Sequence, residues 1–315
     1  ELGRWDDLLG LVEHGTTEVA RQAAAYWRTA VLNNEGLAAK WAPRKGPVAA
    51  KLRTLWEMSP KQYRKTIVAA TNVVEQQMCA KRWSAINYEH VPSVAAARYN
   101  KAFSRNDSTR YSAYAQALTD GKAKINASVV FPHDVVRAAR DRGTTSAVID
   151  AQWKALPDFT EGKASDILVM SDVSGSMCTP VSGSVTAMDI SVALGLYISE
   201  RQTGAFKDLV LTFSGEPEFH HVRGSGIVDR ISNLQNANWG MSTNLNAAFR
   251  LVLRTAVQNG VAHEDMPKML LILSDMEFDY ANMNGRHTNF QALQKMYADA
   301  GYKLPKVVFW NLASR

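Results

Sequence analysis

The chain contains little cysteine: only Cys79 and Cys178 occur among its 315 residues. Two cysteines cannot build the disulfide framework that stabilises many small secreted domains, so a reducing compartment is favoured and we predict a cytoplasmic protein. Long apolar runs are missing too, since none approaches the roughly 20 residues that a membrane-spanning helix needs. We therefore expect no membrane partner.

Catalytic motifs are also scarce. The sequence has no Ser/His/Asp order, no cysteine–histidine pair and no glycine-rich loop that could cradle a phosphate. His220 and His221 are neighbours in a predicted strand, where adjacent side chains point to opposite faces and do not easily share one metal ion. These absences predict that the protein is not an enzyme.

What the sequence does contain is enough apolar material for two globular domains. Hydrophobic residues make up 46% of the chain, and 315 residues exceed the size of one typical core. Residues 156–165 are rich in polar and turn residues and separate two segments with different patterns. We predict an α-helical domain over residues 1–160 and an α/β domain over residues 161–315.

The first segment has helical periodicity and no competing β-branched run. Ser59 and Pro60 supply an N-cap followed by proline at the first helical position, and Asp120-Gly121 supplies a stop. Helices joined by short turns favour an α-helical array of the HEAT-like type, although no clean repeat period is visible. The predicted helices cover residues 5–12, 17–32, 48–58, 60–81, 93–103, 108–119 and 132–141.

The second segment alternates apolar strands with helices. Continuous apolar strands of this kind are typical of a mostly parallel, doubly wound sheet that is covered on both faces. Such sheets bind ligands at the carboxyl ends of their strands. The predicted strands cover residues 166–171, 208–214, 219–222, 268–275 and 306–311. The predicted helices cover residues 185–202, 227–234, 245–258 and 288–300.

A short polar motif, Asp172-x-Ser174-x-Ser176, follows the first predicted strand. One carboxylate and two hydroxyls on alternate residues could converge on a hard cation, because Mg²⁺ takes oxygen ligands and only one or two carboxylates. The alternative is that these residues serve only as turn and N-cap residues, which is common after strands.

Two further residues extend this motif. Thr243 lies in a predicted loop that opens a helix, and Asp275 ends the strand predicted over residues 268–275. Together with Asp172, Ser174 and Ser176 they resemble, in order and spacing, the metal-ion-dependent adhesion site of von Willebrand factor A domains. The resemblance covers roughly residues 164–315 and implies a Rossmann-like fold. It also implies that these five residues hold Mg²⁺ or Mn²⁺, whose coordination an acidic residue of a protein partner can complete.

Positive charge is concentrated in the first segment. Residues 1–160 carry 23 Lys/Arg against 15 Asp/Glu, a net charge of +8, while residues 161–315 carry 13 against 15, a net charge of −2. Basic side chains neutralise phosphates, so this excess favours RNA as a partner. The predicted RNA-binding residues are Arg44, Lys45, Lys61, Arg64, Lys65, Lys81, Arg82, Arg98, Lys101, Arg105, Lys122 and Lys124.

Aromatic residues are interleaved with these cations. Tyr63, Trp83, Tyr88, Tyr99 and Phe103 would offer stacking faces to unpaired bases, so the pattern suits structured or single-stranded RNA. The alternative is equally simple, because solvated charged faces and core aromatics occur in most helical proteins.

A basic helical domain followed by a von Willebrand A domain resembles the architecture of the TROVE family, the Ro autoantigen ribonucleoproteins. The chain is more closely similar to a TROVE-like family of unknown function, in which RNA binding is only inferred. This resemblance is carried by residues 39–45, 63–65, 74–79, 83–88, 91–93, 99–103, 121–126 and 132–133. Since the chain begins at Glu1 and ends at Arg315, just after the last predicted strand, we expect both domains to be incomplete.

These observations predict a non-enzymatic RNA-binding scaffold with a metal-ion-dependent adhesion site. Two alternatives stay open. In the first, the protein is an interaction or assembly module that uses the metal site and contacts no RNA. In the second, the cation serves a Mg²⁺-dependent hydrolase.

Overall fold

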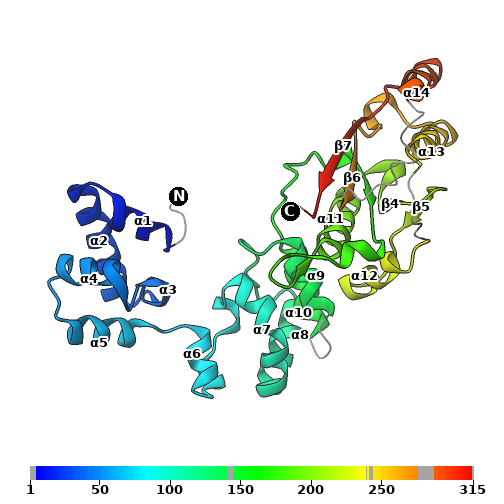
Figure 1. Ribbon diagram of the computed structural model, residues 1–315. Helices are drawn as coiled ribbons and strands as arrows, with labels where there is room; N and C mark the ends of the chain where they lie inside the picture. Colours follow the sequence, from blue (N-terminus) through cyan, green and yellow to red (C-terminus); the bar gives the residue numbers. More distant parts are fainter. Residues whose placement is uncertain (1–4, 141–144, 239, 241–243, 276–286, 314–315) are drawn as a thin grey trace. The chain divides into compact units, whose positions relative to one another are not determined.

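The computed structural model describes the chain except residues 1–4, 141–144, 239, 241–243, 276–286 and 314–315, and it describes no side chain at residues 287–289. It divides into two compact units, residues 1–87 and residues 88–315. We call them the N-terminal unit and the C-terminal unit. The N-terminal unit is helical, and the C-terminal unit contains both helices and a sheet (Figure 1).

All regular elements in the described part of the N-terminal unit are helices. Its core gathers small alanines around two fully buried tryptophans, Trp27 and Trp56. Each indole N–H has an acceptor, since Trp27 donates to the carbonyl of Ala38 and Trp56 to that of Ala24, both at 2.8 Å. The elements are α1 (Asp7–His14), α2 (Thr17–Leu32), α3 (Gly36–Trp41), α4 (Gly46–Leu55), α5 (Pro60–Ala70), α6 (Val74–Cys79) and η1 (Trp83–Ala85).

One predicted helix, over residues 60–81, is two helices in the structure. It begins as predicted, because Ser59 and Gln62 form a reciprocal capping box before α5. At Thr71 the backbone becomes extended, and the Thr71 hydroxyl donates to the carbonyl of Ile67 at 2.6 Å. A threonine hydroxyl that bonds back to the carbonyl four residues earlier disfavours continuation of a helix, which agrees with a stop here.

The C-terminal unit is built on a five-stranded sheet in the order β5-β4-β1-β6-β7 (Figure 1). Strands β4, β1, β6 and β7 are parallel, and only the β4–β5 pair is antiparallel. The prediction of a mostly parallel sheet is confirmed. The strands are β1 (Ile167–Ser171), β4 (Leu209–Thr212), β5 (Phe219–His221), β6 (Met269–Ser274) and β7 (Lys306–Asn311), and a separate hairpin pairs β2 (Pro180–Ser182) with β3 (Val185–Thr186).

Helices cover both faces of this sheet. Because side chains alternate along a strand, Leu168 and Met170 of β1 face one hydrophobic core and Val169 faces another. The first core includes α13 (Leu245–Gln258) and α14 (His287–Asp299), and the second includes α11 (Ala187–Arg201) and α12 (Ile227–Gln235). Helix α11 lies so close to β1 that a Cβ at Gly195 would be 2.6 Å from the Ser171 hydroxyl.

Helices before residue 160 belong to the same unit as the sheet. Val135 and Val136 of α9 (Pro132–Arg140), together with Ile149 and Trp153 of α10 (Ser146–Lys154), join the core of α11 and α12. The described part of this segment also holds η2 (Tyr88–His90), α7 (Ser93–Asn106) and α8 (Ser108–Thr119), and η3 (Ala164–Asp166) follows just before β1. The sequence-based prediction missed helices α3 and α10.

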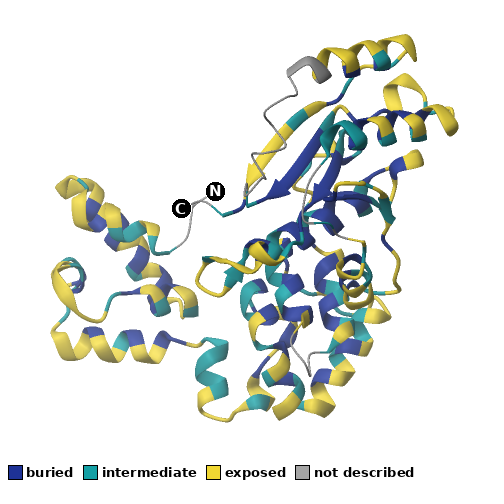
Figure 2. Cartoon of the chain, turned by 45° about the vertical axis from the view of Figure 1, so that its right-hand side comes forward, coloured by how far each residue is buried: buried dark blue, intermediate teal, exposed yellow. Residues whose placement is uncertain are grey.

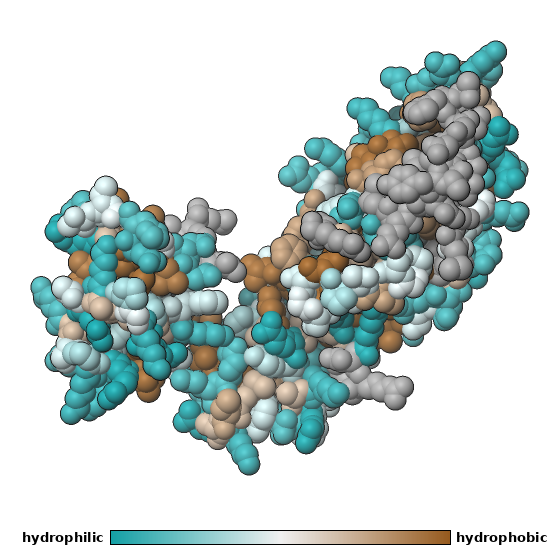
Figure 3. Space-filling model, viewed as in Figure 1, coloured by the Kyte–Doolittle hydropathy of each residue, from teal (hydrophilic) through white to brown (hydrophobic). Residues whose placement is uncertain are grey.

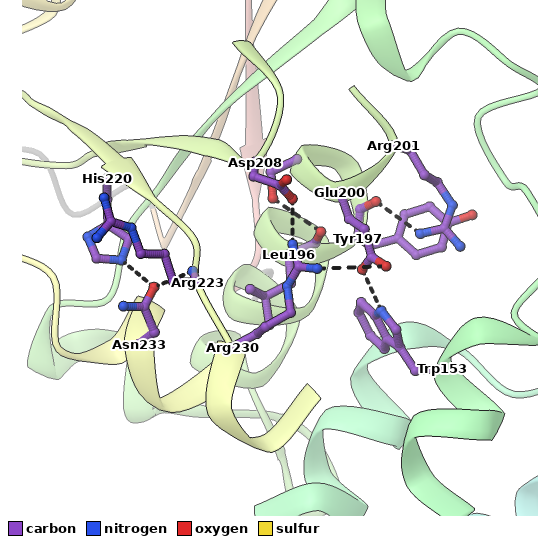
Figure 4. A network of polar contacts seen from close by, with 11 residues as sticks. Trp153, Leu196, Tyr197, Glu200, Arg201, Asp208, His220, Arg223, Arg230 and Asn233 are labelled. Carbon is purple, nitrogen blue, oxygen red and sulfur yellow. Dashed lines mark hydrogen bonds and ion pairs between the residues drawn. The ribbon is translucent and has the colours of Figure 1, made fainter. Parts of the chain in front are cut away.

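Polar contacts reinforce this packing (Figure 4). The indole N–H of Trp153 on α10 donates to Glu200 of α11 at 2.7 Å, and Arg230 of α12 pairs with both Glu200 and Asp208. A second set of ion pairs joins α9 to the first turn of α11, where Arg137 and Arg140 meet the buried Asp189. Helices α9, α10, α11 and α12 are thus joined by charge as well as by apolar contact.

The division into units therefore lies away from the boundary near residue 160 that the sequence predicts. The predicted linker is fastened to α11: Tyr197 donates to the carbonyl of Pro157 and accepts from the backbone N–H of Phe159 at 2.8 Å. The predicted linker has the composition of a turn, but the packing of side chains decides where a compact unit ends. No helix in the described ranges is long and apolar enough to cross a membrane.

Candidate metal site and basic surface

Four of the five predicted metal ligands, Asp172, Ser174, Ser176 and Asp275, follow the ends of two neighbouring strands. Asp172 follows β1, and its backbone N–H donates to the carbonyl of Leu273 on β6 at 2.9 Å, so the strand pairing continues to the motif. Asp275 follows β6 directly. Because β1 and β6 are parallel neighbours, their carboxyl ends meet at one edge of the sheet.

The Asp172 carboxylate is held at both of its oxygens. Oδ1 accepts the backbone N–H of Ser174 at 2.9 Å, and Oδ2 accepts the hydroxyl of Ser274 at 2.9 Å. Asp172 is 2% exposed and Ser274 is 1% exposed. An ionised carboxylate offers about four acceptor sites, so these two bonds orient the group and leave it able to bind a cation or its water.

The two motif hydroxyls lie next to each other. The Oγ atoms of Ser174 and Ser176 are 3.0 Å apart, within hydrogen-bonding distance. Adjacent oxygens of an octahedral Mg²⁺ shell with ligands at about 2.0–2.1 Å are separated by roughly 2.9 Å. The same arrangement therefore suits a shared hydrogen bond and one edge of a Mg²⁺ octahedron, so an ion could bind with little movement.

Thr243 lies outside the described residues. The described residues on either side of it are bonded to the end of β4, the other neighbour of β1. The backbone N–H of Gly240 donates to the carbonyl of Phe213 at 3.2 Å, and that of Asn244 donates to the carbonyl of Ser214 at 3.1 Å. Asn244 also caps α13 by accepting from Ala247.

The donor set is one of hydroxyls and aspartates. Among the described residues, no three His, Cys, Asp or Glu side chains form a group that could hold a metal ion. A site here must therefore use serine oxygens, which suit Mg²⁺ or Mn²⁺ better than a softer metal. That these residues bind a cation stays a prediction.

Ser274 is a residue that the sequence-based prediction missed. We expect Ser274→Ala to lower the affinity for Mg²⁺ or Mn²⁺ about 10- to 100-fold, because the hydrogen bond that orients a ligand is lost. Titration of the metal into purified protein, followed by calorimetry, measures the change. Ser274→Thr keeps a hydroxyl and should retain most of the affinity.

Ser171 provides the matched control for this experiment. It is also a fully buried serine at a strand end, but its hydroxyl lies 3.4 Å from the carbonyl of Ser191 on α11 instead of facing the motif. Ser171→Ala should leave metal affinity unchanged. Equal losses in both alanine variants would mean that general destabilisation, and not the orientation of Asp172, causes the effect.

The predicted RNA-binding residues are all exposed, but they divide between the two units. Seven lie in the N-terminal unit and five in the C-terminal unit. On α5, Lys61, Arg64 and Lys65 share one exposed face, and on α7 so do Arg98, Lys101 and Arg105. The structure thus brings together the three basic residues of each helix face.

The division into units concentrates the charge. The N-terminal unit carries 13 Lys/Arg against 8 Asp/Glu, a net charge of +5, whereas the C-terminal unit carries 23 against 22, a net charge of +1. Within residues 40–82 the count is 10 against 2, a net charge of +8. Figure 3 shows hydrophilic side chains over the side of the N-terminal unit that α5 occupies.

The predicted stacking aromatics are largely unavailable, which corrects the sequence-based hypothesis. Tyr63, Tyr88 and Phe103 are buried. Tyr63 packs on Trp56 with ring centroids 5.1 Å apart, and burial raises the pKa of Tyr63 to about 12. Trp83 and Tyr99 are half-buried. Tyr63, Tyr88 and Phe103 thus pack in the cores between helices, in agreement with the alternative interpretation that these aromatics are core residues.

The two halves of the chain match two different family models. Residues 29–160 match a domain of unknown function, DUF2828, and residues 166–315 match another domain of unknown function, DUF7788. Their boundary, between residues 160 and 166, lies at the predicted linker. Neither description names a TROVE or von Willebrand A domain, so that identification stays a prediction.

A curated viral relative covers both halves. The chain is 30% identical to "Uncharacterized protein L728" of Acanthamoeba polyphaga mimivirus over 88% of its own length and 52% of the relative's length. The chain therefore spans about half of that protein. No solved structure matches the chain significantly.

Proposed function

We propose that the protein is a non-enzymatic, cytoplasmic RNA-binding scaffold in which the N-terminal unit contacts RNA and the C-terminal unit holds a divalent cation. The concentration of positive charge carries the first part of this proposal. Residues 40–82 carry a net charge of +8. They form short helices, and most of their basic side chains are exposed. A surface of this kind attracts a polyanion and contacts phosphates.

The site at the ends of β1 and β6 supports the second part. Asp172, Ser174 and Ser176 lie together with Asp275 nearby in the order of a metal-ion-dependent adhesion site, on a sheet topology that suits a von Willebrand A domain. With Thr243 they would hold Mg²⁺ or Mn²⁺. On the side that faces solvent, an acidic residue of a protein partner would complete the coordination of such an ion. A HEAT-like, TROVE-like helical region in the same chain agrees with a ribonucleoprotein scaffold.

Filter binding of structured RNA over a salt series tests RNA binding. We expect affinity to fall linearly on a log–log plot, because phosphate contacts release counterions. Two triple charge reversals to glutamate compare the units: Lys61, Arg64 and Lys65 on α5, and Arg98, Lys101 and Arg105 on α7. The α5 variant should bind more weakly and lose about one unit of slope for each lost phosphate contact.

The α7 variant is the matched control for charge, since it changes the same number of cations on one exposed helix face. Because the C-terminal unit has little net charge, we expect a smaller loss from it than from the α5 variant. A larger loss from the α7 variant would move the RNA to the C-terminal unit. An absence of salt-dependent binding by the wild-type protein would contradict RNA binding altogether.

A second candidate function, protein assembly without RNA, is favoured by the edge strand β7. Three consecutive large apolar residues of this strand, Val308, Phe309 and Trp310, are exposed, whereas β1 and β6 are buried (Figure 2). Exposed apolar edge strands are suited to pairing with another strand. Under this alternative, RNA titrations of the wild-type protein would be flat, and Trp310→Glu on β7 would weaken binding to a protein partner.

A further inference from the structure

One tryptophan of the N-terminal unit is placed unlike its core tryptophans. Trp27 and Trp56 are fully buried, and each indole N–H donates to a carbonyl. Trp41, the last residue of α3, is 42% exposed, and its indole makes no hydrogen bond with any described residue. Leaving a large aromatic ring in water forgoes the stabilisation that burial would provide, so Trp41 is suited to contact something outside the chain.

The segment that carries Trp41 is held in place. Lys40 pairs with Glu75 of α6 at 2.8 Å. The carbonyl of Pro43 accepts the hydroxyl of Tyr63 at 3.0 Å, and the Arg44 guanidinium lies 3.4 Å from the hydroxyl of Thr71. These contacts fasten the chain on both sides of Trp41 to α5 and α6, so little ordering entropy is lost when a ligand binds there.

The surroundings of Trp41 are strongly basic. Arg44 and Lys45 follow it by three and four residues and are exposed. Trp41 also lies at the start of the segment 40–82, which carries a net charge of +8. An apolar ring beside exposed cations complements a ligand that has flat apolar faces and negative charge, and unpaired nucleotides have both features.

We propose that Trp41 stacks on an unpaired base of a single-stranded RNA segment whose neighbouring phosphates contact Arg44 and Lys45. This inference rests on the proposed RNA-binding function and names the form of RNA that the site selects. A base inside a duplex is stacked on its neighbours and cannot present its face to Trp41. The site therefore distinguishes single strands from duplexes.

The test compares Trp41→Ala, Trp41→Phe and the double variant Arg44→Glu/Lys45→Glu in the full chain. The probes are a fluorescein-labelled, unstructured 12-nucleotide RNA and a blunt RNA duplex, titrated by fluorescence anisotropy over a salt series. Trp41→Ala should weaken single-strand binding about tenfold or more and leave the salt slope and the duplex affinity unchanged. Trp41→Phe keeps a stacking face and should retain most of the affinity. The double variant should lower the salt slope for both probes.

The outcomes separate this inference from the function on which it rests. If Trp41→Ala binds the single strand as the wild type does, while the double variant binds weakly, stacking is wrong and RNA binding stands. Equal losses for single strand and duplex would also overturn the inference. If the wild-type protein binds neither probe, both proposals fail. Because Trp41 is exposed, circular dichroism should show an unchanged fold in every variant.

Discussion

Asp172→Ala is expected to abolish binding of Mg²⁺ or Mn²⁺, with a loss of affinity of at least about 100-fold. The substitution removes a carboxylate that both Ser174 and Ser274 orient, and few hard ligands remain at the site. RNA affinity should change little, because most of the net positive charge lies in the other unit. Isothermal titration with the metal and filter binding with RNA measure the two effects on the same preparation.

Asp166→Ala is the matched control. Asp166 precedes the same strand, β1, at its opposite end, and its carboxylate pairs with Lys268 at 2.9 Å. This variant should keep full metal affinity. Asp172→Ala leaves two donors without their acceptor, at a cost of about 1–3 kcal/mol, so circular dichroism must show that the variant is folded. A loss of RNA affinity as large as that of the α5 charge reversal would show that the cation itself contacts phosphate.

Trp56→Ala is expected to destabilise the N-terminal unit by about 3–5 kcal/mol, because it leaves a large cavity in a small core. The side chain is fully buried, packs on Tyr63 and donates to the carbonyl of Ala24. Urea unfolding followed by circular dichroism should show an early transition. RNA affinity should fall with that transition, while metal affinity in the C-terminal unit should persist.

Trp41→Ala supplies the control for this experiment, since it removes an exposed tryptophan from the same unit. Its unfolding midpoint should match that of the wild type. The expected separation depends on the two units having their own hydrophobic cores, as they have in the structure. A Trp56→Ala variant that loses metal affinity together with RNA affinity would show that the units unfold as one.

Local patterns predicted most of the elements. The strands β1, β4 and β6 follow apolar runs, because a parallel strand buried on both faces needs apolar residues at every position. Strand β7 also follows an apolar run, although most of its residues are exposed. The N-cap residue Ser59 followed by Pro60 predicted the start of α5. Helix α10 was missed and the helix over residues 60–81 was not divided, because short helices depend on their neighbours more than on their own periodicity.

The candidate site was also predictable in part from local sequence patterns. Asp172, Ser174 and Ser176 are close in sequence, so their spacing already places them at one strand end. Ser274 was not predictable as a partner of Asp172, since 102 residues separate the two and only the pairing of β1 with β6 brings them together. The neighbouring Asp275 marked the strand end, but a serine before it carries no distinct signal.

The sequence by itself determined the helical and α/β character of the two segments, the sheet's strands and the concentration of basic residues. These features depend on composition and on short-range periodicity. Only the tertiary structure decided that α9 and α10 share the core of α11, that Tyr63, Tyr88 and Phe103 are buried, and that Trp41 stays exposed. An aromatic ring has the same local pattern in a core and on a surface, and the contacts that distinguish the two come from residues far away in the chain.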